Sequence, residues 1–131
     1  MMYDLRIFIE MSYSKQLTAE LVMHKTNTNQ LNRIKNLNFC ANDLKDVSIV
    51  SQMGSLEVLS LSVNQISSLK DIGQCTQLQE LYIRRNNIDS IEELENLVSL
   101  GSLRILWLAE NPVASMPGYR QKVVSLLPQL H

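Results

Sequence analysis

The chain has 131 residues, a formal net charge of −1 and a sequence pI near 6.1. A chain of this length forms one domain that buries roughly two-thirds of its unfolded surface. The near-zero charge excludes an overall basic field that would attract nucleic acid or anionic lipid, and no apolar run reaches the roughly 18 residues of a membrane-spanning helix. We therefore expect a cytoplasmic protein that binds neither a membrane nor nucleic acid directly.

The first ten residues fit no structural pattern in the rest of the chain. Met1–Glu10 reads MMYDLRIFIE, where Asp4 and Arg6 interrupt the apolar stretch and no small-residue cleavage site follows, so it is not a secretory signal. Met11 opens MSYSKQLTAEL, which reads as a natural chain start. We predict an N-terminal extension over 1–10 that contributes little to stability, and one domain over 11–131.

A short amphipathic helix is predicted for the TAELVMHKTNT segment, which begins at Thr18. Thr18 suits the N-cap position, and Glu20 lies in the first turn, where the positive end of the helix favours an acidic side chain. Leu21 and Val22 form its apolar face. The helix is placed to cover the open end of the repeats that follow it, and we assign residues 14–30 to an N-terminal cap.

Four copies of one apolar frame follow. They read IKNLNFCANDL, LEVLSLSVNQI, LQELYIRRNNI and LRILWLAENPV and start at positions 34, 56, 78 and 103, so successive starts lie 22, 22 and 25 residues apart. All fit the pattern L-x-x-L-x-L-x-x-N-x-L, which at this period indicates a leucine-rich repeat protein. We predict an α/β fold, a right-handed solenoid of four repeats over about 31–116 with a parallel sheet on its concave side.

The L-x-L centre of each frame predicts a short strand because its apolar residues alternate with period two. The asparagine at the ninth position carries amide donors and an acceptor, which can satisfy backbone groups left open where the chain turns away from the sheet. We therefore predict a buried structural ladder of four asparagines: Asn42, Asn64, Asn86 and Asn111.

The return segment of the third repeat is three residues longer than those of the first two. It contains SIEELENLVSL, in which Ser90 and Glu93 have the spacing of a capping box. We predict one or two true helical turns here and shorter 3₁₀ or irregular segments elsewhere. The acidic side chains of Glu92, Glu93 and Glu95 are predicted to lie on a solvated convex face.

The last frame is followed by a predicted C-terminal cap over 117–131. The segment GYRQKVVSLLP predicts a helix after Pro117. Its apolar face consists of four residues at helical spacing: Tyr119, Val123, Leu126 and Leu127.

Catalysis has almost no support in this sequence. The two histidines, His24 and His131, have no cysteine or paired acid at metal-ligand or triad spacing. The four glycines are isolated, so no phosphate-binding loop is present. Cys40 and Cys75 belong to different repeats and are expected to act as small hydrophobic residues. We predict a protein that is not an enzyme and uses no metal or cofactor.

Alternation along the strands defines which side chains face outward on the concave sheet. The central outward position reads Asn38, Ser60, Tyr82 and Trp107 through the four repeats, so large side chains gather in the last two. Trp, Tyr and Arg are enriched at binding hot spots. The predicted partner-binding residues are Trp107, Tyr82, Arg84, Arg85, Glu80 and Ile105. The alternative is that Trp107 only packs against the cap or against neighbouring strand residues.

These motifs resemble those of known proteins at two levels, a broad class and a particular family. The 22-residue frame with its helical cap resembles the short-repeat class that includes the U2 A-prime protein and the Sds22-type phosphatase regulators. The segments LSVN, LYIRRN and LWLAENP, with the 22, 22, 25 spacing, more specifically resemble the cilia- and flagella-associated family over about residues 12–131. This resemblance implies a protein-interaction scaffold at the cilium base or basal body that binds a NIMA-related kinase.

Members of that family continue past the cap with a leucine–aspartate segment, a linker and a helical oligomerisation region. Because this chain stops at His131, we expect the oligomerisation region to be absent from it. Two alternatives stay open, a ribonucleoprotein scaffold of the U2 A-prime type and a phosphatase regulatory module. The lack of a basic stripe on the concave face disfavours the first, and a need for more than four repeats disfavours the second.

Overall fold

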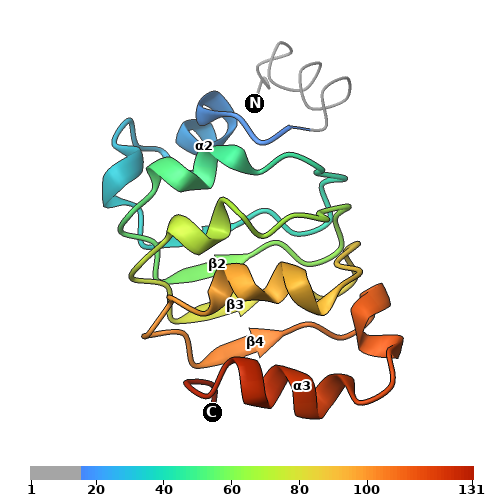
Figure 1. Ribbon diagram of the computed structural model, residues 1–131. Coiled ribbons are helices and arrows are strands. Elements are labelled where there is room, and N and C mark those ends of the chain that lie inside the picture. The colour runs from blue at the N-terminus through green and yellow to red at the C-terminus, as the bar shows by residue number, and fades with distance from the viewer. Residues whose placement is uncertain (1–15) are drawn as a thin grey trace.

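The computed structural model describes residues 16–131, which form a stack of four coils (Figure 1). Each coil contributes one strand, and the strands pair in chain order as one parallel sheet: β1 (Asn36–Asn38), β2 (Val58–Ser60), β3 (Glu80–Tyr82) and β4 (Ile105–Trp107). The predicted leucine-rich repeat solenoid with a concave parallel sheet is confirmed. The predicted extension over 1–10 and the first two residues of the predicted cap lie outside the described residues.

The segments outside the sheet contain five 3₁₀ helices: η1 (Leu31–Arg33), η2 (Ser48–Gln52), η3 (Ile72–Gln74), η4 (Ile91–Leu97) and η5 (Pro112–Ser115). Of these, η2, η3 and η4 stack on one another along the convex side (Figure 1). The helix of the third repeat, η4, is the longest, and Ser90 Oγ caps it by accepting from the Glu93 N–H. It is 3₁₀ throughout, which differs from the predicted true helical turn. A 3₁₀ helix rises further per residue than an α-helix, so it recrosses the coil with fewer residues.

Two α-helices cover the ends of the stack (Figure 1). At one end lies α2 (Ala19–Thr26), where Thr18 Oγ1 accepts from the Leu21 N–H at 3.2 Å, as its predicted N-cap role requires. At the other end lies α3 (Tyr119–Leu126), which begins after Gly118 in the left-handed region at φ 72°. Both cap helices occur where the sequence predicts them.

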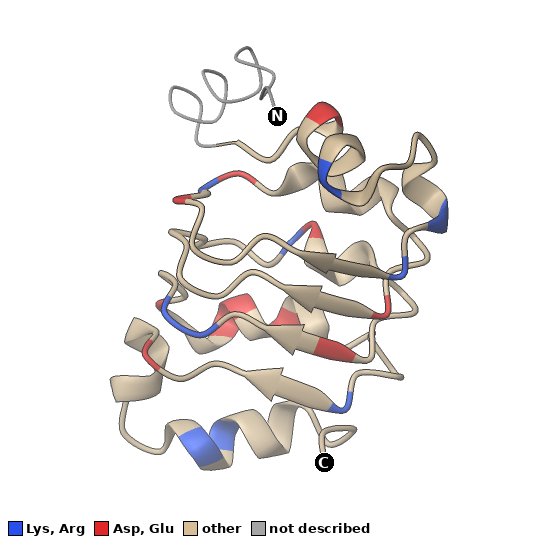
Figure 2. Ribbon diagram, turned by 180° about the vertical axis from the view of Figure 1, so that it is seen from behind, with Lys and Arg blue, Asp and Glu red and all other residues tan. Residues whose placement is uncertain are grey.

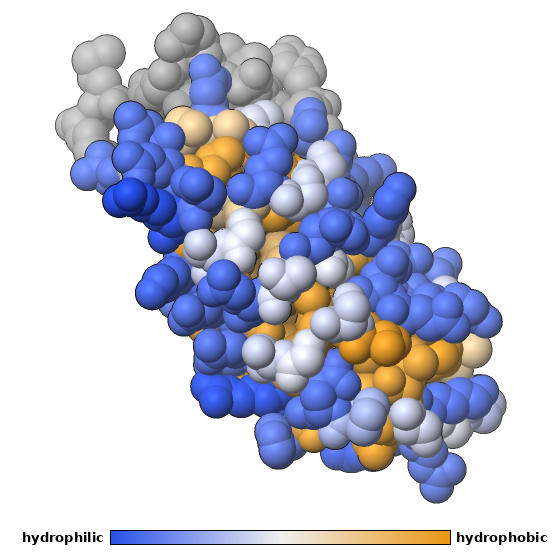
Figure 3. Space-filling model, turned by 60° about the vertical axis from the view of Figure 1, so that its left-hand side comes forward, coloured by the Kyte–Doolittle hydropathy of each residue, from blue (hydrophilic) through white to orange (hydrophobic). Residues whose placement is uncertain are grey.

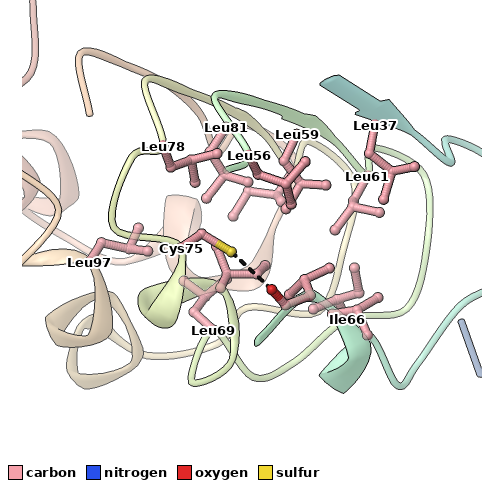
Figure 4. Packing of buried hydrophobic residues seen from close by; sticks show 14 of the residues in the cluster. Leu37, Leu56, Leu59, Leu61, Ile66, Leu69, Cys75, Leu78, Leu81 and Leu97 are labelled. Carbon is pink, nitrogen blue, oxygen red and sulfur yellow. Dashed lines mark hydrogen bonds between the residues drawn. The ribbon is translucent and has the colours of Figure 1, made fainter. Parts of the chain in front are cut away.

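Inward leucines of successive coils form one continuous core (Figure 4). Leu59 and Leu81 lie in register on neighbouring strands, and both are fully buried. Cys75 belongs to this core, and its thiol donates to the Val50 carbonyl at 3.3 Å. Burial, with a smaller contribution from the charge of Asp71, raises the pKa of the Cys75 thiol to about 11. Since the thiolate is the reactive form, Cys75 is a packing residue.

Asparagine side-chain amides form hydrogen bonds between neighbouring coils, just beyond the C-terminal ends of the strands. Asn86 Oδ1 accepts from the Ile66 N–H of the preceding coil at 3.0 Å. Its Nδ2 donates to the Leu61 carbonyl of that coil at 3.0 Å and to the Ile83 carbonyl of its own coil at 3.1 Å. Asn64 and Asn111 bond in the same way, and all three are buried.

The first asparagine of the predicted ladder differs from the other three. Asn42 is half-buried, and its Nδ2 donates to the Cys40 carbonyl within its own coil at 2.8 Å. The difference has a simple cause, because β1 is an edge strand of the described sheet and offers Asn42 no preceding strand to bond. The prediction of a buried amide at Asn42 is therefore wrong.

One of the acidic convex residues also differs from its prediction. Glu92 and Glu95 are exposed, but Glu93 is half-buried. Glu93 Oε1 accepts from the Leu69 N–H of the preceding repeat at 2.6 Å and from Asn96 Nδ2 at 3.1 Å. Glu93 thus joins two repeats, because a backbone donor of the adjacent coil lies within its reach.

A row of left-handed residues runs alongside the ladder. The residue before each frame asparagine has a positive φ: Ala41 (59°), Val63 (60°), Arg85 (57°) and Glu110 (61°). A β-branched side chain is a conformational outlier in this region, because its branch crowds the backbone. Val63 therefore carries the largest conformational cost in the row.

Replacing Val63 with asparagine, which tolerates left-handed backbone, is expected to raise the free energy of unfolding by about 1 kcal/mol. Little packing is lost, since Val63 is 45% exposed. Urea denaturation measures the change. The matched control is Val58→Asn in β2, which is expected to lower stability because valine suits a strand. A loss of stability in Val63→Asn would contradict the strain argument.

Candidate protein-binding site

The third and fourth coils bring all six predicted partner-binding residues to one region of the described chain. Strand register pairs Tyr82 with Trp107 and Glu80 with Ile105. Arg84 and Arg85 follow β3 after one residue, Ile83, and both are exposed. Figure 2, which is turned by 180° from Figure 1, shows the sheet in front, with charged residues near both ends of the strands and an acidic one within β3. The site therefore has an aromatic centre with charged groups on either side.

Trp107 and Tyr82 form the aromatic centre. Their ring centroids lie 4.8 Å apart at an interplanar angle of 88°, the edge-to-face arrangement that aromatic pairs favour. Trp107 does contact a neighbouring strand residue, as the packing alternative has it, yet the residue remains 55% exposed. Tyr82 supports it without burying it, which leaves a large apolar surface open to solvent.

The carboxylate of Glu80 fixes the orientation of Tyr82. The Tyr82 hydroxyl donates to Glu80 Oε1 at 2.5 Å. This hydrogen bond, with burial as a smaller cause, raises the pKa of the Tyr82 phenol. The hydrogen bond thus holds in place the ring that supports Trp107.

A shared carboxylate connects the two arginines. Arg84 Nη2 lies 3.1 Å from Glu110 Oε1, and Arg85 Nε lies 2.9 Å from Glu110 Oε2. All three side chains are about half exposed, at 47%, 57% and 50% in that order. Two guanidinium groups share one carboxylate, so the cluster keeps one uncompensated positive charge.

The sequence prediction missed Glu110. Its position follows the end of β4, so strand alternation does not assign it to a face. The signal that locates it is the repeat itself, since Glu110 and Arg85 both stand immediately before a frame asparagine. Residues at equivalent positions of adjacent coils lie side by side, and here their charges are opposite.

A shallow hollow lies beside η4 and α3, away from the concave site. It is lined by six residues: Ile91, Gly118, Gln121, Lys122, Ser125 and Leu126. Figure 3 shows the largest continuous hydrophobic area of its view toward the C-terminal end of the stack. The lining of this hollow contains no aromatic residue and one charged residue, so it offers fewer specific contacts than the concave site.

The described residues contain neither a membrane-spanning helix nor a cluster of metal-ligating side chains. Within residues 16–131, none of the helices has the length and apolar character needed to cross a bilayer. Over the same residues, no three His, Cys, Asp or Glu side chains lie together in a way that would hold a metal ion.

The stacked coils, the asparagine ladder and the helical caps define a class of protein. The chain matches the family model described as "Leucine-rich repeat" over residues 17–131, and it belongs to that family. It is 44% identical to human cilia- and flagella-associated protein 410 over 117 residues, which are 88% of the chain and 46% of that protein. The mouse protein is 43% identical across 88% of the chain and 47% of its own length. The resemblance predicted from the repeat motifs is confirmed.

Solved structures share the fold. A leucine-rich repeat protein of Leptospira interrogans, LIC12759, matches with a TM-score of 0.70 and 27% identity, covering 88% of this chain and 27% of its own. A chain of the Drosophila melanogaster SNF/U2A′ complex matches with a TM-score of 0.69 and 23% identity, covering 88% and 81%. The latter likeness shows the fold alone. The chain spans less than half the length of its human and mouse relatives.

Proposed function

We propose that this chain is a non-catalytic protein-interaction scaffold that binds its partner on the concave face of the third and fourth repeats. The observation that carries this proposal is the 55% exposure of Trp107, which is held against Tyr82 beside the two arginines. Exposed tryptophan with supporting tyrosine and arginine is the composition that dominates binding energy at protein interfaces. In this arrangement Trp107 and Tyr82 are apolar anchors, and Arg84 and Arg85 contact an acidic or phosphorylated segment.

We further propose that the scaffold acts in the cytoplasm at the base of the cilium or at the basal body. Support comes from the similarity to cilia- and flagella-associated protein 410 in human and mouse. The family resemblance makes a NIMA-related kinase the candidate partner. The ribonucleoprotein alternative draws only on a fold likeness at 23% identity, and no feature of the site favours the phosphatase alternative.

The change Trp107→Ala is expected to weaken partner binding by about 2 kcal/mol or more. Its melting temperature should stay near that of the wild type, because an exposed side chain leaves no cavity in the core. The measurement is quantitative capture of a candidate NIMA-related kinase by the tagged full chain, with thermal melting of each variant in parallel.

The matched control for this experiment is Glu92→Lys. Glu92 is exposed on the convex side and changes charge without touching the concave sheet. Glu93 would be an unsuitable control, since it accepts from the Leu69 N–H. Undiminished capture by Trp107→Ala would rule out the concave site, and loss with Glu92→Lys alone would move the interface to the convex side.

A further inference from the structure

We propose that Glu110 occupies the place of a partner's carboxylate, and that the concave site takes an extended segment with an acidic side chain two residues from an apolar one. This inference rests on the proposed function, because it specifies what that same site binds. Glu110 then acts as an internal competitor that sets how strongly the site selects acidic segments.

The geometry of the ion pairs is the first support. Both oxygens of one carboxylate are engaged, one by Arg84 at 3.1 Å and the other by Arg85 at 2.9 Å. A carboxylate is therefore the chemistry this arginine pair already accommodates. Exposed ion pairs of this kind contribute little to stability, so an incoming carboxylate can displace Glu110 at small cost.

The second support is the net positive charge of the cluster formed by Arg84, Arg85 and Glu110. Glu110 neutralises one of the two guanidinium groups, and the other keeps an attraction for anions. On the other side of the aromatic pair, the carboxylate of Glu80 in β3 supplies a negative charge. The site thus has an acidic end, an apolar centre and a basic end.

Strand geometry sets the distances between the acidic end, the apolar centre and the basic end of the site. Glu80, Tyr82 and Arg84 are two residues apart along the chain, so neighbouring side chains of this row stand about 7 Å from each other. An extended segment running along β3, in either direction, presents every second side chain with the same spacing. Charge complementarity then selects a basic, an apolar and an acidic residue at alternate positions.

The only tryptophan of the chain lies in this site, so its fluorescence reports binding without a label. We would titrate the full chain with the peptide Lys-Ser-Leu-Ser-Glu, blocked at both ends. Two matched peptides accompany it: Lys-Ser-Leu-Ser-Gln, which lacks the acidic side chain, and a version with phosphoserine in place of the glutamate. The first peptide is expected to bind at least about fivefold more tightly than the glutamine peptide.

Variants of the chain test which side chains determine the affinity for the first peptide. Glu110→Gln is expected to tighten binding of the first peptide about threefold, because the competing charge is gone. Arg84→Gln is expected to weaken it about fivefold. The double variant should bind more weakly than Glu110→Gln alone, and the convex control Glu92→Gln should match the wild type.

Several results would overturn the inference. These are equal binding of the glutamate and glutamine peptides, no binding of either, and an unchanged or weakened affinity in Glu110→Gln. Tighter binding of the phosphoserine peptide than of the glutamate peptide would replace the carboxylate by a phosphorylated segment. Loss of partner capture in Trp107→Ala, alongside any of these results, would leave the proposed concave interface standing while this inference fails.

Discussion

Leu81→Ala is expected to lower the free energy of unfolding by about 2–5 kcal/mol, the largest effect of any change considered in this chain. Leu81 is fully buried, in register with Leu59 on one side and Leu106 on the other. Truncation removes its transfer free energy and leaves a cavity between coils. Hydrogen bonds between the strands hold the coils at a set spacing, so the cavity cannot collapse fully.

The matched control is Leu106→Ala, at the same frame position in β4. Leu106 is half-buried, because it belongs to the last coil and no further strand of the sheet lies beside it. A smaller loss is therefore expected, and urea denaturation of both variants measures the difference. Equal losses would show that burial in the stack does not set the energy of the frame leucines.

Asn86→Ala is expected to lower the free energy of unfolding by about 1–3 kcal/mol. The buried Ile66 N–H loses the Asn86 Oδ1 that accepts its hydrogen bond at 3.0 Å. The carbonyls of Leu61 and Ile83 lose one donor each but keep another, from Asn64 and Asn111 respectively. The orphaned donor therefore accounts for most of the loss.

Asn42→Ala is the control for the ladder, since Asn42 is half-buried and bonds within its own coil. Its loss is expected to stay below that of Asn86→Ala. Asn86→Asp separates the two functions of the amide, because it keeps an acceptor for the Ile66 N–H and removes the donors. Thermal or urea unfolding that coincides for Asn86→Ala and the wild type would refute the ladder account.

The candidate site was predictable in part. Alternation placed Tyr82 and Trp107 on one outward row, and their register in the sheet agrees with that placement. Glu110 was missed because it lies beyond the strand, where period two no longer applies. The role of Glu93 was misjudged for a related reason, since its partner, the Leu69 N–H, belongs to another coil.

The sequence by itself determined the repeat, the strand centres, the inward leucines and the two cap helices. Each of these depends on a pattern within about ten residues. The repeat frame occurs four times, so a chance match in any one frame has little effect on the prediction. The tertiary structure alone decided which equivalent positions behave differently. Asn42 and Leu106 are less buried than their counterparts because the stack ends beside them. The pairing of both arginines with Glu110 depends on contact between adjacent coils, about one repeat apart in sequence, which a local pattern does not encode.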